Sequence, residues 1–322
     1  MQIFSFISVG ELAAPVLGGV LYKKAGDEGV FGLGAAILVI DFLMRLLVIE
    51  KKSAARYSED LAIDENTQRT HDEGGEDSDS ASEEQPLLGT EKEEYEVPPN
   101  QHRWVQKLPF SYCLKDPRLL TAFLLAFVQA TLLAAFDATI PVHAQDLFEF
   151  DSLKAGLLFI ALDIPYLIFG PIAGWAVDRY GTKPAAVIGF TYVVPVLILL
   201  RLPHRGGTSQ IVLYCAILAL CGIGLAIIGS PSIVEASQVV QKYDKANPGF
   251  FGANGPYAQL YGCNSMVFSA GLTMGPLLSG ILSDKIGYGN MNIALAGLAL
   301  ITAVFSFVYV GGKPGMLKRL TK

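Results

Sequence analysis

Long apolar runs of about 20 residues follow one another along most of this chain and limit what it can fold into. About 20 apolar residues are what an α-helix needs to cross the hydrocarbon core of a bilayer. With 52% hydrophobic residues and a mean hydropathy of +0.42, the chain is more apolar than soluble domains usually are. The sequence therefore predicts an all-α, polytopic membrane protein. The candidate spans, about eight by this length criterion, are 2–22, 29–49, 119–142, 153–176, 184–202, 211–235, 257–282 and 291–311.

Three of these runs share one pattern of proline, glycine and charge. Each has a Pro, one or two Gly shortly after it, and a charged turn closed by Gly. Proline removes a backbone hydrogen bond and bends the helix, and small residues let a neighbouring helix approach closely. The pattern is typical of helices that rock against one another, and we expect its prolines to act in gating. They are Pro15, Pro171 and Pro276.

One acidic block, from 59 to 96, accounts for the negative net charge of −6. The surrounding residues are rich in Glu, Asp, Ser, Gly and Pro, so they cannot bury enough apolar surface to fold. Lys and Arg are more frequent near the span ends on the side of this block, which predicts that it is cytoplasmic. The predicted domains are a partial N-terminal bundle (1–50), a disordered acidic cytoplasmic linker (51–118), a six-helix C-terminal bundle (119–312) and a cytoplasmic tail (313–322).

A possible sorting signal lies within the acidic linker. Glu83 precedes the pair Leu87 and Leu88 at the spacing of an acidic dileucine signal. Such matches also arise by chance in acidic loops, so two interpretations remain open. The segment binds a sorting adaptor, or it is a solvated spacer.

Three charged residues outside the linker have two interpretations each. Asp41 and Arg45 are four residues apart on one face of a helix, so they form an internal ion pair or belong to a coupling network. Glu235 lies near the inner end of its span, where it is a solvated helix end or has a role in coupling. A charge inside a span is costly unless it is paired or faces a cavity.

Asp137 is the strongest candidate for a group that binds protons or substrate. It lies in an apolar run between Phe136 and Pro141, where a carboxylate must face a partner or a wet cavity. Such a group can load and release a proton. The alternative is that Asp137 is solvated near the outer end of its helix. Asp163 and Tyr166 on the next span form a similar pair, three residues apart.

Neutral polar residues within the spans are further candidates for a cavity wall. They are Gln129, Tyr257, Tyr261 and Asn264, the last three at helical spacing, and packing between helices is the alternative. No nucleophile–base or metal-ligand pattern occurs, and the Gly-rich stretch 249–255 has no P-loop features. We therefore expect no enzyme activity, no cofactor, no metal and no nucleic-acid partner.

The turn between the fourth and fifth candidate spans resembles the signature loop of the major facilitator superfamily. The matching residues are Gly174, Ala176, Asp178, Arg179, Gly181 and Lys183. The resemblance implies that Gly174, Asp178, Arg179, Gly181 and Lys183 belong to a gate for alternating access. That family has twelve spans, so it also implies that the counterparts of the first four spans are absent from this sequence.

Within that superfamily the chain is most similar to the vesicular amine transporter-like branch of drug:proton antiporters, fungal members especially. The likeness rests on 41–50, 136–141 and 165–168. It implies that Asp137 is a substrate-site carboxylate and Tyr166 an aromatic wall residue. Gly229 and Ser265 stand where amine transporters have acidic residues, so a less basic organic substrate fits better.

The expected function is proton-coupled export or vacuolar sequestration of a small organic compound by alternating access. The expected partners are that substrate, protons, the lipid bilayer and a sorting adaptor on the linker. Two alternatives remain: a facilitative transporter of a neutral solute, or a truncated membrane protein that binds a partner and does not transport. The expected location is an integral multi-pass protein of the vacuolar, endosomal or plasma membrane.

Overall fold

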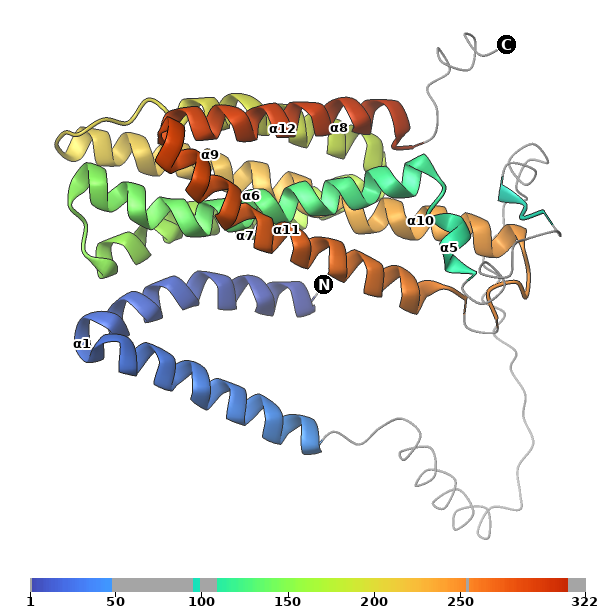
Figure 1. The fold of residues 1–322 in the computed structure, drawn as a ribbon, viewed down its shortest axis with the longest axis horizontal. Coiled ribbons are helices and arrows are strands. Elements are labelled where there is room, and N and C mark those ends of the chain that lie inside the picture. Colours follow the sequence, from blue (N-terminus) through green and yellow to red (C-terminus); the bar gives the residue numbers. More distant parts are fainter. Residues whose placement is uncertain (1, 48–94, 99–108, 253–254, 312–322) are drawn as a thin grey trace, which may run out of the picture. The chain divides into compact units, whose positions relative to one another are not determined.

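The structure, a computed structural model, describes residues 2–47, 95–98, 109–252 and 255–311, and all the regular elements described there are helices. Figure 1 shows them along the chain. Among these residues, seven helical segments are long and apolar enough to cross a membrane. The helices are α1 (Gln2–Leu47), α5 (Phe110–Cys113), α6 (Pro117–Phe148), α7 (Ser152–Tyr180), α8 (Thr182–Leu199), α9 (Thr208–Gly229), α10 (Pro231–Ala246), α11 (Tyr257–Ile286) and α12 (Tyr288–Tyr309).

The first two predicted spans appear as one long helix, α1, with a break. Gly26 has φ 63° and ψ −158°, which no helical residue adopts, so α1 consists of two arms that meet there. A residue without a side chain tolerates this conformation best. The first arm, up to Lys23, belongs to the same compact unit as the C-terminal bundle, and residues 24–88 form a separate unit.

Local sequence sets the ends of the central helices. The side chain of Asp116 caps α6 by accepting a hydrogen bond from the Arg118 amide at 2.8 Å, and Pro117 follows at the first helical position. Asp151 caps α7 by accepting from the Lys154 amide at 3.0 Å. Gly181, with φ 91°, ends α7 and leads directly into α8. These caps lengthen the helices beyond the apolar runs that the sequence marks.

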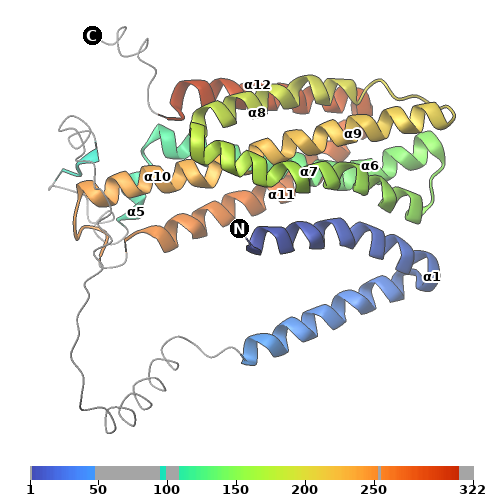
Figure 2. The same ribbon diagram turned by 180° about the vertical axis from the view of Figure 1, so that it is seen from behind.

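The six-helix bundle is built from close helix pairs. α6 packs along α11, α7 along α9, and α8 along α12, as both views show. Figure 2 shows α7, α8 and α9 on the near side. The main core lies between α6, α7, α8, α9 and α12, and contains large side chains such as Phe190 and Tyr214 that are fully buried.

Glycines bring some of these helices into backbone contact. A Cβ placed on Gly222 of α9 would lie 2.0 Å from the carbonyl oxygen of Leu162 in α7. A Cβ on Gly275 of α11 would lie 2.6 Å from the carbonyl oxygen of Thr131 in α6. Both distances are shorter than any non-bonded contact allows, so these crossings require glycine.

Part of the range predicted as linker is packed against the bundle. Tyr95, Phe110 and Cys113 are buried in a second apolar cluster with residues of α6, α10 and α11. Burial raises the pKa of the Cys113 thiol to about 12. The reason is the concentration of aromatic residues near the end of the linker, which gives this part enough apolar surface to pack. α6 itself begins at Pro117, before the predicted boundary at 118.

Some predicted features lie outside the described residues. They include Met1, most of the acidic linker with Glu83, Leu87 and Leu88, and the tail 313–322.

Candidate functional site

A cavity of about 420 Å³ opens between the first arm of α1 and the helices α6, α7 and α9. Its wall is largely apolar, with two carboxylates and one phenol. A small number of polar groups in an apolar cavity is typical of sites for small organic molecules. The lining residues are Ala14, Pro15, Leu133, Asp137, Phe159, Asp163, Tyr166 and Leu225.

The first arm of α1 is held against the start of α7 by glycine contacts and an ion pair. A Cβ on Gly19 would lie 2.7 Å from the Ser152 carbonyl oxygen, and one on Gly156 would lie 2.6 Å from the Pro15 carbonyl oxygen. The Lys23 ammonium donates to the Asp151 carboxylate at 2.9 Å. This hydrogen bond, with the one from the Lys154 amide, lowers the pKa of Asp151. Pro15 is thereby brought into the cavity wall.

Three residues that the sequence predicted to bind protons or substrate line this cavity together. Asp137 comes from α6, and Asp163 and Tyr166 come from α7. The side chain of Asp137 is exposed and lines the cavity. Two carboxylates that share a cavity repel each other unless a proton or a cation lies between them. The arrangement can therefore take up protons or positively charged groups.

Gly229 lies beside both the amide of Gln129 and the phenol of Tyr166. A Cβ on Gly229 would lie 3.5 Å from Gln129 Nε2 and 4.0 Å from the Tyr166 hydroxyl. These are ordinary contact distances, so a small side chain fits at position 229. The position where amine transporters have an acid thus lies beside predicted cavity residues.

The predicted wall on α11 does not line this cavity. Tyr257 lies at the start of α11 beside Asp244, and Tyr261 is 51% exposed. The Oδ1 atom of Asn264 is buried and accepts no hydrogen bond from the described part of the chain. The sequence predicted their helical spacing correctly, but they belong to a different region from Asp137.

The signature loop forms the tight turn between α7 and α8. Asp178 and Arg179 are exposed, and the Arg179 guanidinium lies 5.5 Å from the Trp175 ring centroid. Lys183 lies over the Phe307 ring of α12 at 5.4 Å. Gly174, Pro171 and Pro276 lie within α7 and α11.

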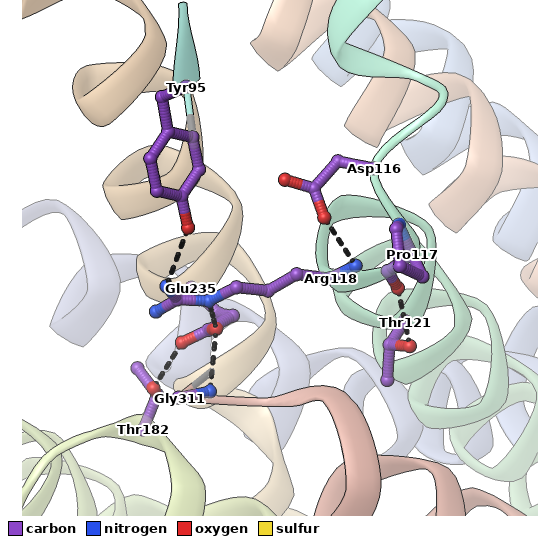
Figure 3. A network of polar contacts seen from close by, with 8 residues as sticks. All are labelled: Tyr95, Asp116, Pro117, Arg118, Thr121, Thr182, Glu235 and Gly311. Atoms are coloured by element: carbon purple, nitrogen blue, oxygen red, sulfur yellow. Dashed lines mark hydrogen bonds and ion pairs between the residues drawn. The ribbon is translucent and has the colours of Figure 1, made fainter. Parts of the chain in front are cut away.

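Glu235 is not a solvated helix end, and that interpretation was wrong. Its side chain is 0% exposed and forms an ion pair with Arg118, as Figure 3 shows. The Thr182 hydroxyl and the Gly311 amide, the latter at 3.0 Å, also donate to this carboxylate. Four helix ends, those of α6, α8, α10 and α12, therefore meet at one buried carboxylate.

Sequence analysis did not single out Arg118, which is the last residue of the predicted linker. The available signal was the capping pattern Asp116-Pro117, which places Arg118 inside the first turn of a helix that starts in an apolar environment. Arg118 is 8% exposed, and its Nη1 lies 3.5 Å from the Tyr95 hydroxyl. A buried arginine needs a buried acid, and Glu235 is that acid.

Asp41 and Arg45 form the predicted ion pair within the second arm of α1. The Arg45 Nε donates to Asp41 at 2.8 Å, and both side chains are more than half exposed. This agrees with the internal-pair interpretation.

A metal site formed by three or more His, Cys, Asp or Glu side chains is absent from the described ranges.

Comparisons with known proteins identify the family. Residues 3–253 match the Major Facilitator Superfamily. The chain is 46% identical over 326 residues to the MFS-type transporter ppzB of Metarhizium majus, covering 98% of this chain and 72% of the relative.

Two further relatives are more distant. An uncharacterized MFS-type transporter of Schizosaccharomyces pombe is 34% identical over 301 residues, with coverages of 93% and 62%. The vesicular acetylcholine transporter of Drosophila melanogaster is 22% identical over 308 residues, with coverages of 92% and 43%. The family comprises transporters and not enzymes. By its sequence match and its helical fold, the chain belongs to the Major Facilitator Superfamily of membrane transporters.

Proposed function

We propose that this protein is a proton-coupled secondary transporter that exports a small organic compound, or sequesters it in a vacuole, through the cavity between α1, α6, α7 and α9. The single observation that supports this most is the pair of carboxylates, Asp137 and Asp163, in one mostly apolar cavity. A carboxylate in a membrane-spanning cavity can bind a proton in one access state and release it in the other. The ring of Phe159 and the phenol of Tyr166 offer surface for an organic substrate.

The substrate that we propose is a neutral or weakly basic organic compound. The chain shares the vesicular amine transporter-like pattern around Asp137 and Tyr166, which supports membership in that branch. Gly229, however, supplies no carboxylate beside the Tyr166 hydroxyl, and Ser265 supplies none on α11. With fewer acids, the cavity offers less stabilisation to a permanently charged amine.

A transport assay with one matched pair of variants tests the proposal. The full chain is reconstituted in vesicles with an imposed pH gradient. Export of a panel of fluorescent organic compounds is then followed together with proton movement, reported by an internal pH dye. Asp137→Asn removes the proton site but keeps size and hydrogen bonding, so it should abolish pH-driven flux while the amount of folded protein stays constant.

The control for this assay is Asp146→Asn, on the same helix but outside the cavity, which should transport as the unmodified protein does. Unchanged pH-driven flux in Asp137→Asn would contradict the proposed role. Flux that is equal with and without the pH gradient would instead support a facilitative transporter.

A further inference from the structure

α9 and α10 are two parts of one membrane-spanning segment, joined at a weak point beside the cavity. Thr208 to Ala246 form one candidate span whose apolar part is α9. α9 ends at Gly229 and α10 begins at Pro231, while Ser230 between them keeps right-handed helical backbone angles (φ −91°, ψ −36°). Proline donates no backbone hydrogen bond, so the ladder between the two parts is incomplete there. Gly229, immediately before this interruption, is the residue next to Gln129 and Tyr166. The N-terminal end of α10 therefore lies beside the candidate site.

The C-terminal end of α10 is bound by residues 95–97, which belong to the predicted linker. The side chain of Asn247, which follows α10, accepts from the Val97 amide at 2.8 Å and donates to the Tyr95 carbonyl at 2.8 Å. Its amide group also donates to the Tyr243 carbonyl at 2.9 Å, which fixes the side chain on the end of α10. Asn247 thus holds the main chain of residues 95–97 by two hydrogen bonds.

The side chain of Tyr95 extends this contact toward the buried ion pair. Its ring packs edge-on against Tyr243, with centroids 5.0 Å apart and an interplanar angle of 84°. The Lys242 ammonium lies 5.5 Å from the Tyr95 ring centroid. The hydroxyl reaches Arg118, which is paired with Glu235 of α10, as Figure 3 shows. Tyr95 is only 9% exposed, so the segment is packed into the bundle and does not lie loosely on its surface.

We propose that residues 95–97 are a clamp that holds α10 against α6 and so restrains movement of α10 about the Gly229–Pro231 interruption. The acidic linker sequence leads directly into the clamp, which makes the linker a means of controlling the cavity from outside the bundle. α10 is held near both of its ends. Arg118 binds Glu235 near the N-terminal end, and the clamp binds Asn247 at the C-terminal end. This regulatory role rests on the proposed transport function. The clamping contact itself does not.

Hydrogen exchange tests the clamping contact without any transport assay. Asn247→Ala removes both hydrogen bonds to the segment, and the amides of α10 should then exchange about ten- to thirtyfold faster, the effect of losing two ordinary hydrogen bonds. Asn290→Ala is the matched control. Asn290 also donates to a carbonyl four residues earlier, that of Ile286 at 2.9 Å, but lies at the start of α12. Equal exchange of α10 in both variants and the unmodified protein would overturn the proposal.

Thiol labelling gives a second measurement and guards against misfolding. In a chain with Cys113 as its only cysteine, this buried thiol should resist maleimide at pH 8 and should label about tenfold faster once Asn247→Ala loosens its cluster. Tyr95→Phe keeps the ring but loses the contact with Arg118, so it should show a smaller increase in a protein that remains folded. Labelling as slow as in the parent in both variants would count against the clamp.

A reversible staple tests the regulatory role. The pair Val97→Cys and Asn247→Cys joins the clamp to the end of α10 under oxidising conditions. Transport should stop on oxidation and return on reduction, while either single variant is insensitive to the oxidant. Full transport by the stapled protein would overturn the role of the clamp in control. Absence of transport in every protein, the unmodified one included, would instead count against the proposed function, and the exchange data would still decide whether the clamp exists.

Discussion

Single side chains determine how the linker end of the bundle is held together. Arg118 and Glu235 are 117 positions apart in the chain, yet both are buried and form one ion pair. The Gly311 amide and the Thr182 hydroxyl satisfy the remaining acceptor capacity of the carboxylate. A buried charge that loses its partner is far more destabilising than an exposed one, because no water replaces the lost contact.

Arg118→Met should therefore destabilise the protein by about 3–5 kcal/mol, because it leaves the buried Glu235 carboxylate without a counter-charge. Combining it with Glu235→Gln removes both charges and keeps an acceptor for Gly311 and Thr182, so much of the loss should be recovered. Thermal unfolding in detergent, followed by intrinsic fluorescence, measures the stability of the single and the double variant. A loss below about 1 kcal/mol in the single variant would mean that the pair behaves like an exposed one.

The Lys23–Asp151 ion pair predicts that the stability of the folded protein depends on pH. The pKa of Asp151 is lowered by its hydrogen bonds from Lys23 and from the Lys154 amide, so its contribution to stability is present above the ordinary carboxyl pKa, about 3.9. That contribution is lost as the pH falls through the lowered pKa. Asp151→Asn keeps a good helix cap and removes the charge.

The unmodified protein should therefore melt at a higher temperature than Asp151→Asn at pH 7, and the difference should shrink as the pH approaches 3. Melting curves of both proteins across this range supply the test. A difference that stays constant with pH would show that the charge of Asp151 makes no contribution.

At the scale of helices, glycines decide how closely neighbours approach. Gly222 lets α9 contact the α7 backbone, and Gly19 and Gly156 do the same for α1 and α7. In a bilayer the hydrophobic effect does not drive helices together, so close packing is a main source of their association. The same contacts place Pro15 and Leu225 in the wall of the cavity.

Gly222→Ala should destabilise the bundle by about 1–3 kcal/mol, because the added methyl group would overlap the Leu162 carbonyl oxygen and push α9 away from α7. Gly280→Ala is the control, since no atom lies within 4 Å of a Cβ placed there. Alanine favours a helix by up to about 1 kcal/mol over glycine, so the control should be neutral or stabilised. Equal losses in the two variants would contradict the packing explanation.

At the scale of the whole molecule, the sequence places a long acidic segment between its first apolar runs and the helices from α6 onward. The bundle carries the cavity, and the acidic segment carries the dileucine pattern of Glu83, Leu87 and Leu88. Residues that direct a protein to a compartment act through adaptors and do not need to touch the cavity. Location and transport should therefore be separable by mutation.

Replacing Leu87 and Leu88 by Ala should move a fluorescent fusion of the protein from the vacuole or endosome to the cell surface, with transport activity retained. Microscopy of the fusion in intact cells, with Leu61→Ala in the same linker as the control, measures this. An unchanged distribution would leave the acidic block as a solvated spacer.

The sequence by itself determined the spans, their approximate ends, the Pro and Gly positions and the candidate carboxylates, because these depend on local composition and length. Only the tertiary structure decided which residues meet: Asp137 with Asp163 and Tyr166 in one cavity, but not with Tyr257 or Tyr261. The physical reason is that a helix in a membrane is apolar on its lipid face and on its packed face alike, so the sequence carries little information about which face turns inward. Contacts between distant segments, such as Arg118 with Glu235 or Tyr95 with Tyr243, depend on how the helices are assembled.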